Sequence, residues 1–124
     1  MILVDTCGWI EWLTDGPLAA HFESALTDTS HLLVPTSVQF ELYKWTRREK
    51  GEALALEAVA LTEQGQVLPL TSSIALFAGD LALEHQLSFA DAIIYATARH
   101  HDAELLTCDD HFEQLDGVIY ISKR

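Results

Sequence analysis

The sequence predicts an open α/β fold, in which a sheet of parallel strands carries helices on both faces. Short segments that are almost continuously apolar recur along the chain, as expected for strands that are buried on both faces. Longer segments with helix-capping residues separate them, and this alternation is typical of α/β proteins. A chain of 124 residues fits one domain with one core, so we expect a single domain over residues 1–124.

The order of the elements follows from short apolar runs and from helix-boundary residues between them. The predicted strands are Ile2–Val4, Leu32–Val34, Val67–Leu70, Glu104–Thr107 and Val118–Ile121. The first predicted helix is capped by Thr6 and ends near Gly16, and the second has Pro17 in its first turn. The third begins with a Thr36–Gln39 capping box and ends at Gly51, and the fourth is Glu52–Gln64. The fifth runs from Ser73 to about His85, and the sixth begins with Ser88 and Asp91 and runs through His100.

Composition limits the classes of function. Hydrophobic residues make up 49% of the chain, which argues against intrinsic disorder. No apolar stretch is long enough to span a bilayer, and the N-terminus lacks the basic and apolar regions of a signal peptide. The two cysteines, Cys7 and Cys108, make neither a disulfide framework nor a zinc-binding spacing. We therefore expect a cytoplasmic protein with reduced thiols and no membrane contact.

The net charge of −12 opposes binding to phosphates, which normally depends on Lys and Arg. Bound cations would reverse the potential locally. Four of the seven basic residues also lie close together, at Lys44, Arg47, Arg48 and Lys50. With Trp45 among them, Lys44, Arg47 and Arg48 are candidates for RNA contact. The alternative is that Trp45 belongs to the core and the charges form a solvated helix face.

Four acidic residues lie next to core-forming segments, where a carboxylate is costly unless something compensates it. They are Asp5, Glu41, Asp91 and Asp109. Asp5 and Asp109 follow predicted strands, at the edge where open α/β sheets bind ligands. Glu41 and Asp91 lie in early turns of helices that can border the same crevice. The order of elements therefore allows all four to meet.

Each of these acids also has a purely structural explanation. Asp5 can cap the first helix, and Asp109 can form a turn with Asp110. Asp91 can stabilise a helix N-terminus, and Glu41 can form an ion pair on a solvated face. Against this stands the position of Asp91, whose neighbours three, four and seven residues further on are largely apolar.

Four ionised carboxylates in one place would repel each other strongly. At about 5 Å and an effective dielectric near 20, each pair would cost about 3 kcal/mol, and six such pairs would exceed the roughly 5–15 kcal/mol stability of a typical domain. Protonation or bound cations must relieve this repulsion. Oxygen ligands favour Mg²⁺ or Mn²⁺ over Zn²⁺, and these cations support phosphodiester cleavage by polarising the phosphate and activating water.

Four segments have the order and spacing of motifs from a known family. They are residues 3–10 (LVDTCGWI), Pro35-Thr36-Ser37 leading to Glu41, residues 87–98 (LSFADAIIYATA) and residues 105–112 (LLTCDDHF). On these segments the chain resembles PIN-domain ribonucleases, and most closely the VapC-type toxins of bacterial toxin–antitoxin pairs. The pieces Leu-Ser-x-Ala-Asp-Ala and Thr-x-Asp-x-x-Phe are the more specific ones, and the similarity covers essentially the whole chain.

The resemblance implies a three-layer α/β/α PIN-like fold with a central parallel sheet of four to five strands. It implies an Mg²⁺- or Mn²⁺-dependent endoribonuclease toxin that cleaves RNA with a metal-activated water. It also implies a homodimer that a cognate antitoxin neutralises. By position, the catalytic metal ligands are Asp5, Glu41, Asp91 and Asp109, and the hydroxyls that support them are Thr6 and Thr107.

One alternative to this enzyme is the same fold with weak or no catalysis, acting as a binding module through a protein partner. Other catalytic types have less support. The chain has no nucleophile elbow and no glycine-rich phosphate loop, and Asp5 lacks the second Asp two residues on that a haloacid dehalogenase needs. The six histidines are expected mainly at the surface or at helix ends, with His111 a candidate for substrate contact.

Overall fold

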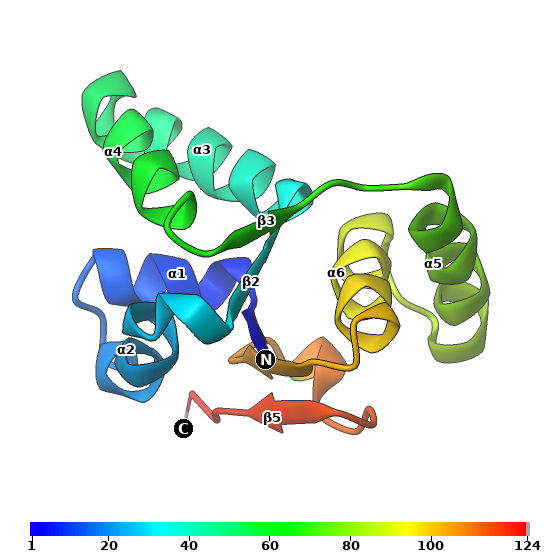
Figure 1. Cartoon of the computed structure of the whole chain (residues 1–124). Coiled ribbons are helices and arrows are strands. Elements are labelled where there is room, and N and C mark those ends of the chain that lie inside the picture. Colours follow the sequence, from blue (N-terminus) through cyan, green and yellow to red (C-terminus); the bar gives the residue numbers. More distant parts are fainter. Residues whose placement is uncertain (124) are drawn as a thin grey trace.

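The computed structural model describes residues 1–123 and contains a five-stranded parallel sheet between two groups of helices (Figure 1). The strands are β1 (Ile2–Val4), β2 (Leu32–Pro35), β3 (Gln66–Leu68), β4 (Glu104–Thr107) and β5 (Val118–Tyr120). The helices are α1 (Thr6–Leu13), α2 (Ala19–Thr27), α3 (Thr36–Lys50), α4 (Glu52–Thr62), α5 (Ser72–His85) and α6 (Phe89–His100), with 3₁₀ turns η1 (Thr29–His31) and η2 (Asp110–Phe112). The three-layer α/β/α prediction is confirmed, and strand ends differ from prediction by no more than two residues.

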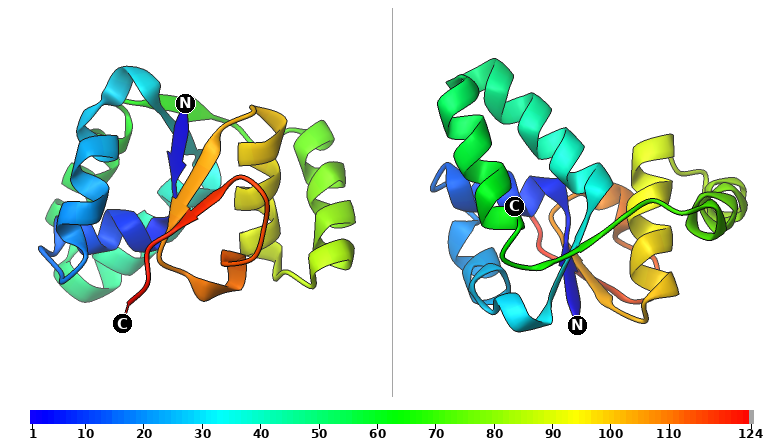
Figure 2. Two further views of the ribbon diagram at one scale, coloured as in Figure 1. Left: turned by 90° about the horizontal axis from the view of Figure 1, so that it is seen from below. Right: turned by 45° about the horizontal axis from the view of Figure 1, so that its top comes forward.

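The strand order is β3-β2-β1-β4-β5, and every neighbouring pair is parallel. From β1 the chain moves outward to β2 and β3, and then crosses back to β4 on the other side of β1. Because such crossovers are right-handed, this reversal places their helices on opposite faces. Figure 2 shows α1 and α2 on one side of the sheet and α5 and α6 on the other. Ligand crevices form where the order reverses, here between β1 and β4.

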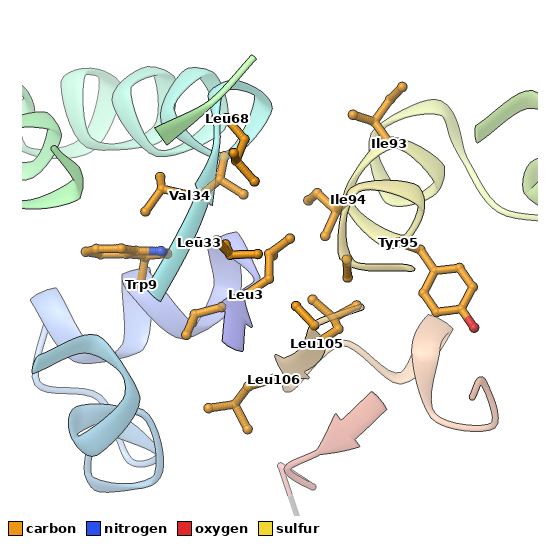
Figure 3. Close-up of a cluster of buried hydrophobic side chains, with 14 of the residues drawn as sticks. Leu3, Trp9, Leu33, Val34, Leu68, Ile93, Ile94, Tyr95, Leu105 and Leu106 are labelled. Atoms are coloured by element: carbon orange, nitrogen blue, oxygen red, sulfur yellow. The ribbon is translucent and has the colours of Figure 1, made fainter. Parts of the chain in front are cut away.

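Both faces of the sheet are buried, as its apolar strands require. Leu3, Val34 and Leu105 have no accessible surface. Trp9 of α1 lies on one side of the strands and Ile94 of α6 on the other (Figure 3). Burial of a large apolar side chain contributes about 1.5–3 kcal/mol, so this two-sided core holds the strand ends in position.

Two predicted helix caps are wrong. Asp5, and not Thr6, caps α1, and its carboxylate accepts a hydrogen bond from the Thr6 amide at 2.8 Å. The Thr36–Gln39 capping box does not form, because α3 has no side-chain cap. The Gln39 amide instead donates to the hydroxyl of Thr62 on α4 at 3.0 Å. Tertiary packing of α3 on α4 therefore outcompetes the local cap.

Two other helix starts are displaced slightly. α2 begins at Ala19, so Pro17 precedes the helix and is not in its first turn. α5 is capped by Thr71, whose hydroxyl accepts a hydrogen bond from an amide three residues on, and Ser73 is already inside the helix. At the start of α5 three successive residues of capping type, Thr71, Ser72 and Ser73, are available, whereas α2 has no side-chain cap.

Two predicted boundaries are confirmed. The Ser88 hydroxyl caps α6 by accepting a hydrogen bond from the Asp91 amide at 3.3 Å, which places Asp91 in the first turn. Gly51 ends α3 with a φ of 97°, a backbone conformation that favours glycine. No helix in the described part of the chain is long and apolar enough to cross a membrane.

Gly8 of α1 lies against the core without room for a side chain. A Cβ there would be 2.6 Å from a ring carbon of Phe22 and 2.7 Å from a methyl group of Val4. We expect Gly8→Ala to lower the free energy of unfolding by about 1–3 kcal/mol, because the core must shift. Denaturant unfolding of the purified variant measures this change.

The matched control is Gly79→Ala on the exposed side of α5, where no atom lies within 4 Å of the added Cβ. Alanine favours a helix by roughly 0.5–1 kcal/mol over glycine, so this variant should be more stable than the parent. Similar changes in the two variants would contradict the close packing around α1.

Candidate active site

The four acids come from four different elements that meet at the carboxyl edge of the sheet. Asp5 directly follows β1 and is only 4% exposed. Asp109 follows β4, the neighbour of β1 across the switch point. Glu41 lies on α3 and Asp91 on α6, and these two helices contact each other. The structure therefore brings all four predicted acids to one region.

Asp5 is held by both of its oxygens. Oδ1 accepts the Thr6 amide, and Oδ2 accepts the Thr107 hydroxyl at 2.8 Å. The same hydroxyl accepts a hydrogen bond from the Asp109 amide at 2.9 Å. Thr107 therefore links the loop after β4 to the acid after β1.

Glu41 is oriented by the other predicted hydroxyl. The Thr6 hydroxyl, at the start of α1, donates to Glu41 Oε1 at 2.8 Å. This contact joins α3 to the first turn of α1 and holds a half-buried carboxylate beside the remaining acids. Both predicted threonines thus contact a predicted acid.

Asp91 and Asp109 are joined by His111, which lies in η2. Its Nδ1 is 3.1 Å from Asp91 Oδ2 and 3.2 Å from Asp109 Oδ1. One donor atom from each of these three residues lies within 4.8 Å of the other two, close enough to hold one metal ion. His111 was not predicted to lie with the acids. Its position two residues after Asp109 in the Thr-x-Asp-x-x-Phe segment was the available signal.

The carboxylates raise each other's proton affinity. Burial raises the pKa of Asp5 well above its usual value, the neighbouring Cys7 thiol raises it further, and the charge of Asp109 makes the smallest contribution. Burial first, and the Asp109 charge second, raise the pKa of Asp91. Burial also raises the pKa of Glu41, with smaller contributions from the charges of Asp91 and Asp109. The acids therefore repel one another, as predicted, although burial raises their pKa values more than this repulsion does.

The pKa of His111 is raised by its hydrogen bond to Asp91 and then by the charges of Asp109 and Asp91. A protonated imidazole between the two carboxylates offsets part of their charge. Asp110, the neighbouring acid, is exposed and begins η2. Asp109, and not Asp110, is therefore the acid in contact with the cluster.

The two cysteines, 101 residues apart, meet beside this cluster as free thiols. The Cys108 amide donates to Cys7 Sγ at 3.3 Å, and Cys7 Sγ lies 3.4 Å from the Thr107 hydroxyl. The neighbouring Cys108 thiol, and then burial, raise the pKa of Cys7, and the Cys7 thiol lowers the pKa of Cys108. Both line a cavity of about 340 Å³ that continues the crevice, with Asp109, Asp110, Tyr120 and Lys123.

The three candidate RNA-contacting residues lie on the exposed side of α3. Lys44 Nζ lies 5.3 Å from the centroid of the Phe40 ring. Arg47 pairs with Glu52 and Arg48 with its neighbour in sequence, both at 3.2 Å. Trp45 is half-buried and lines a separate, largely apolar groove of about 440 Å³ between α1, α3 and α4. The three basic residues therefore lie on the same helix as Glu41, but Trp45 faces a different surface.

Fold and site together define an α/β/α protein with an acidic cluster at its topological switch point. The chain matches the PIN domain over residues 2–118. It belongs to the PIN-domain family, and the predicted family is confirmed.

Solved structures with the same fold include a toxin–antitoxin complex and a toxin. A toxin–antitoxin complex from Klebsiella pneumoniae has a TM-score of 0.77 at 24% identity, covering 96% of each chain. VapC20 of Mycobacterium tuberculosis, described as a sarcin-ricin loop cleaving toxin, has a TM-score of 0.78 at 20% identity, covering 95% of this chain and 97% of that one. DNA-bound VapBC from Salmonella typhimurium has a TM-score of 0.77 at 18% identity, covering 98% and 96%. No curated protein sequence matches the chain.

Proposed function

We propose that the protein is an Mg²⁺- or Mn²⁺-dependent endoribonuclease toxin that a cognate antitoxin neutralises. The observation that carries this proposal is the meeting of four acids from four elements in a PIN-domain chain. Membership of the family supports nuclease activity. The description of VapC20 as a toxin that cleaves the sarcin-ricin loop supports RNA as the substrate class.

The donor set fits a hard divalent cation. Asp5, Glu41, Asp91 and Asp109 offer oxygen atoms, which Mg²⁺ and Mn²⁺ prefer. Burial and mutual repulsion make a cation favourable here, since it would remove the cost that the raised pKa values express. When bound, such a cation would polarise a phosphate oxygen and activate a water.

The chain's own residues would then position the ligands and the substrate. The hydroxyls of Thr6 and Thr107 hold Glu41 and Asp5 in place, and such supporting contacts typically matter 10–100-fold for metal affinity or activity. Exposed Lys44, Arg47 and Arg48 provide positive charge for the phosphates of RNA.

The proposal of an antitoxin partner is supported by the solved relatives, several of which are toxin–antitoxin complexes. The apolar groove between α1, α3 and α4 offers a surface for an antitoxin segment. A homodimer is supported by exposed apolar side chains on α5 and at the start of α6, namely Leu76, Leu83 and Phe89. The molar mass of the purified chain in solution tests the dimer.

Adjacent acids give a matched test of the catalytic proposal. Asp109→Asn should reduce Mg²⁺- or Mn²⁺-dependent RNA cleavage by at least about 100-fold, because it removes charge from the cluster. Asp110→Asn should reduce the rate far less, since Asp110 lines the adjoining cavity but does not belong to the group of side chains that could hold one ion. Initial rates on labelled RNA, with EDTA as the metal-free reference, measure both. A parent protein that binds neither cation and cuts no RNA would instead support a binding module.

A further inference from the structure

We propose that His111 is a nitrogen ligand of the cation held by Asp91 and Asp109, and that it makes this position prefer Mn²⁺ to Mg²⁺. This inference rests on the proposed function for the presence of a cation. It adds a ligand outside the four acids and a choice between the two metals.

The three side chains lie close enough together to be neighbouring ligands of one ion. Ligands at about 2.1 Å from an octahedral cation lie about 3.0 Å apart when adjacent. His111 Nδ1 is 3.1 Å from Asp91 Oδ2 and 3.2 Å from Asp109 Oδ1. Nδ1 is therefore within reach of an ion between the two carboxylates, and it would release its proton to solvent when the cation binds, because a ligating histidine is neutral.

The backbone around His111 is fixed although its ring is exposed. The Asp109 carboxylate accepts a hydrogen bond from the His111 amide at 3.0 Å, which closes the turn into η2. The next residue, Phe112, has no accessible surface and packs on the Tyr95 ring of α6 with centroids 6.4 Å apart. His111 is therefore held over the two carboxylates by a buried neighbour, while 69% of its side chain faces solvent and leaves room for a cation and water.

The ligand chemistry sets the metal preference. Mg²⁺ binds oxygen and keeps its waters, whereas imidazole suits the first-row transition metals. Two carboxylate oxygens alone would serve both cations. An added nitrogen donor strengthens binding of Mn²⁺ more than that of Mg²⁺, so the imidazole of His111 is the group that separates them.

Pulsed EPR of bound Mn²⁺ tests this assignment without any measurement of activity. The parent should show the nitrogen coupling of a directly bound imidazole, and His111→Gln should lose it. In equilibrium binding, His111→Gln should weaken Mn²⁺ by at least about 10-fold and Mg²⁺ by less than about threefold. The control is His101→Gln, at the exposed C-terminal cap of α6, which should keep both the coupling and the affinities.

The outcomes separate this inference from the proposed function. Mn²⁺ that binds the parent and is lost in Asp91→Asn, but shows no nitrogen coupling, would overturn the role of His111 and leave the metal site standing. Equal weakening of both metals in His111→Gln, with unchanged circular dichroism, would overturn the metal preference. A parent chain that binds no divalent cation would overturn both proposals together.

Discussion

Asp5→Asn is expected to reduce metal-dependent cleavage of RNA by at least about 100-fold while the protein stays folded. Asp5 is the most buried of the four acids, and both of its oxygens are held by hydrogen bonds. Asparagine is as good an N-cap as aspartate, so the cap on the Thr6 amide can persist. What the variant loses is the negative charge that would attract a cation. Initial rates on labelled RNA over a range of Mg²⁺ and Mn²⁺ concentrations measure the effect.

The matched control is Asp80→Asn, because Asp80 is an exposed acid on α5. It changes the net charge equally but should keep the parent rate. In addition, metal-free Asp5→Asn should unfold at a higher temperature than the parent near pH 7.5, since it removes a buried carboxylate whose pKa is raised. Cleavage by Asp5→Asn at the parent rate would remove this residue from the mechanism.

The second large effect is a loss of stability with rising pH in the metal-free protein. Asp5, Glu41 and Asp91 have raised pKa values, so the folded state holds protons that the unfolded state has already released. Their contribution is present below the unfolded pKa values, near 4, and is lost as the pH rises toward the folded ones. His111, with its raised pKa, adds a loss of the same sign above about pH 6.5.

Thermal unfolding in EDTA should therefore occur several degrees lower at pH 7.5 than at pH 5. Added Mn²⁺ should reverse the trend, because it binds the ionised carboxylates and stabilises the folded state most at the higher pH. The exposed Asp28, whose pKa is lowered by His31, acts in the opposite direction, but its full exposure makes that effect small. A midpoint that rises from pH 5 to 7.5 in EDTA would contradict the electrostatic description of the site.

The fold was largely predictable from local patterns. Near-continuous apolar runs predicted all five strands. β1, β2 and β4 are largely buried, as such runs indicate, whereas the edge strands β3 and β5 are partly exposed. Helix starts were less certain. At Asp5 and Thr6 two adjacent residues can each cap, and only the backbone direction leaving β1 decides that Asp5 does so. At Gln39 a partner on α4 outcompeted the cap.

The candidate site was predictable in part. The grouping of the four acids was predicted because carboxylates beside apolar segments are costly and because the motifs resemble a known family. His111 was not placed with them, since its role depends on η2 meeting α6, a contact between residues 20 positions apart. The meeting of Cys7 with Cys108 was missed for the same reason, because it needs β1 and β4 to be neighbours.

Taken by itself, the chain's amino-acid order determined where strands and helices lie, which acids border the core, and which family the motifs resemble. These properties depend on patterns of residues that are close together in the sequence, within a single helix, strand or motif. Tertiary structure alone decided that β1 pairs with β4, that α3 touches α6, and that a histidine bridges two of the acids. Those contacts join segments far apart in the chain, and they form only when the apolar faces of whole elements are buried against one another.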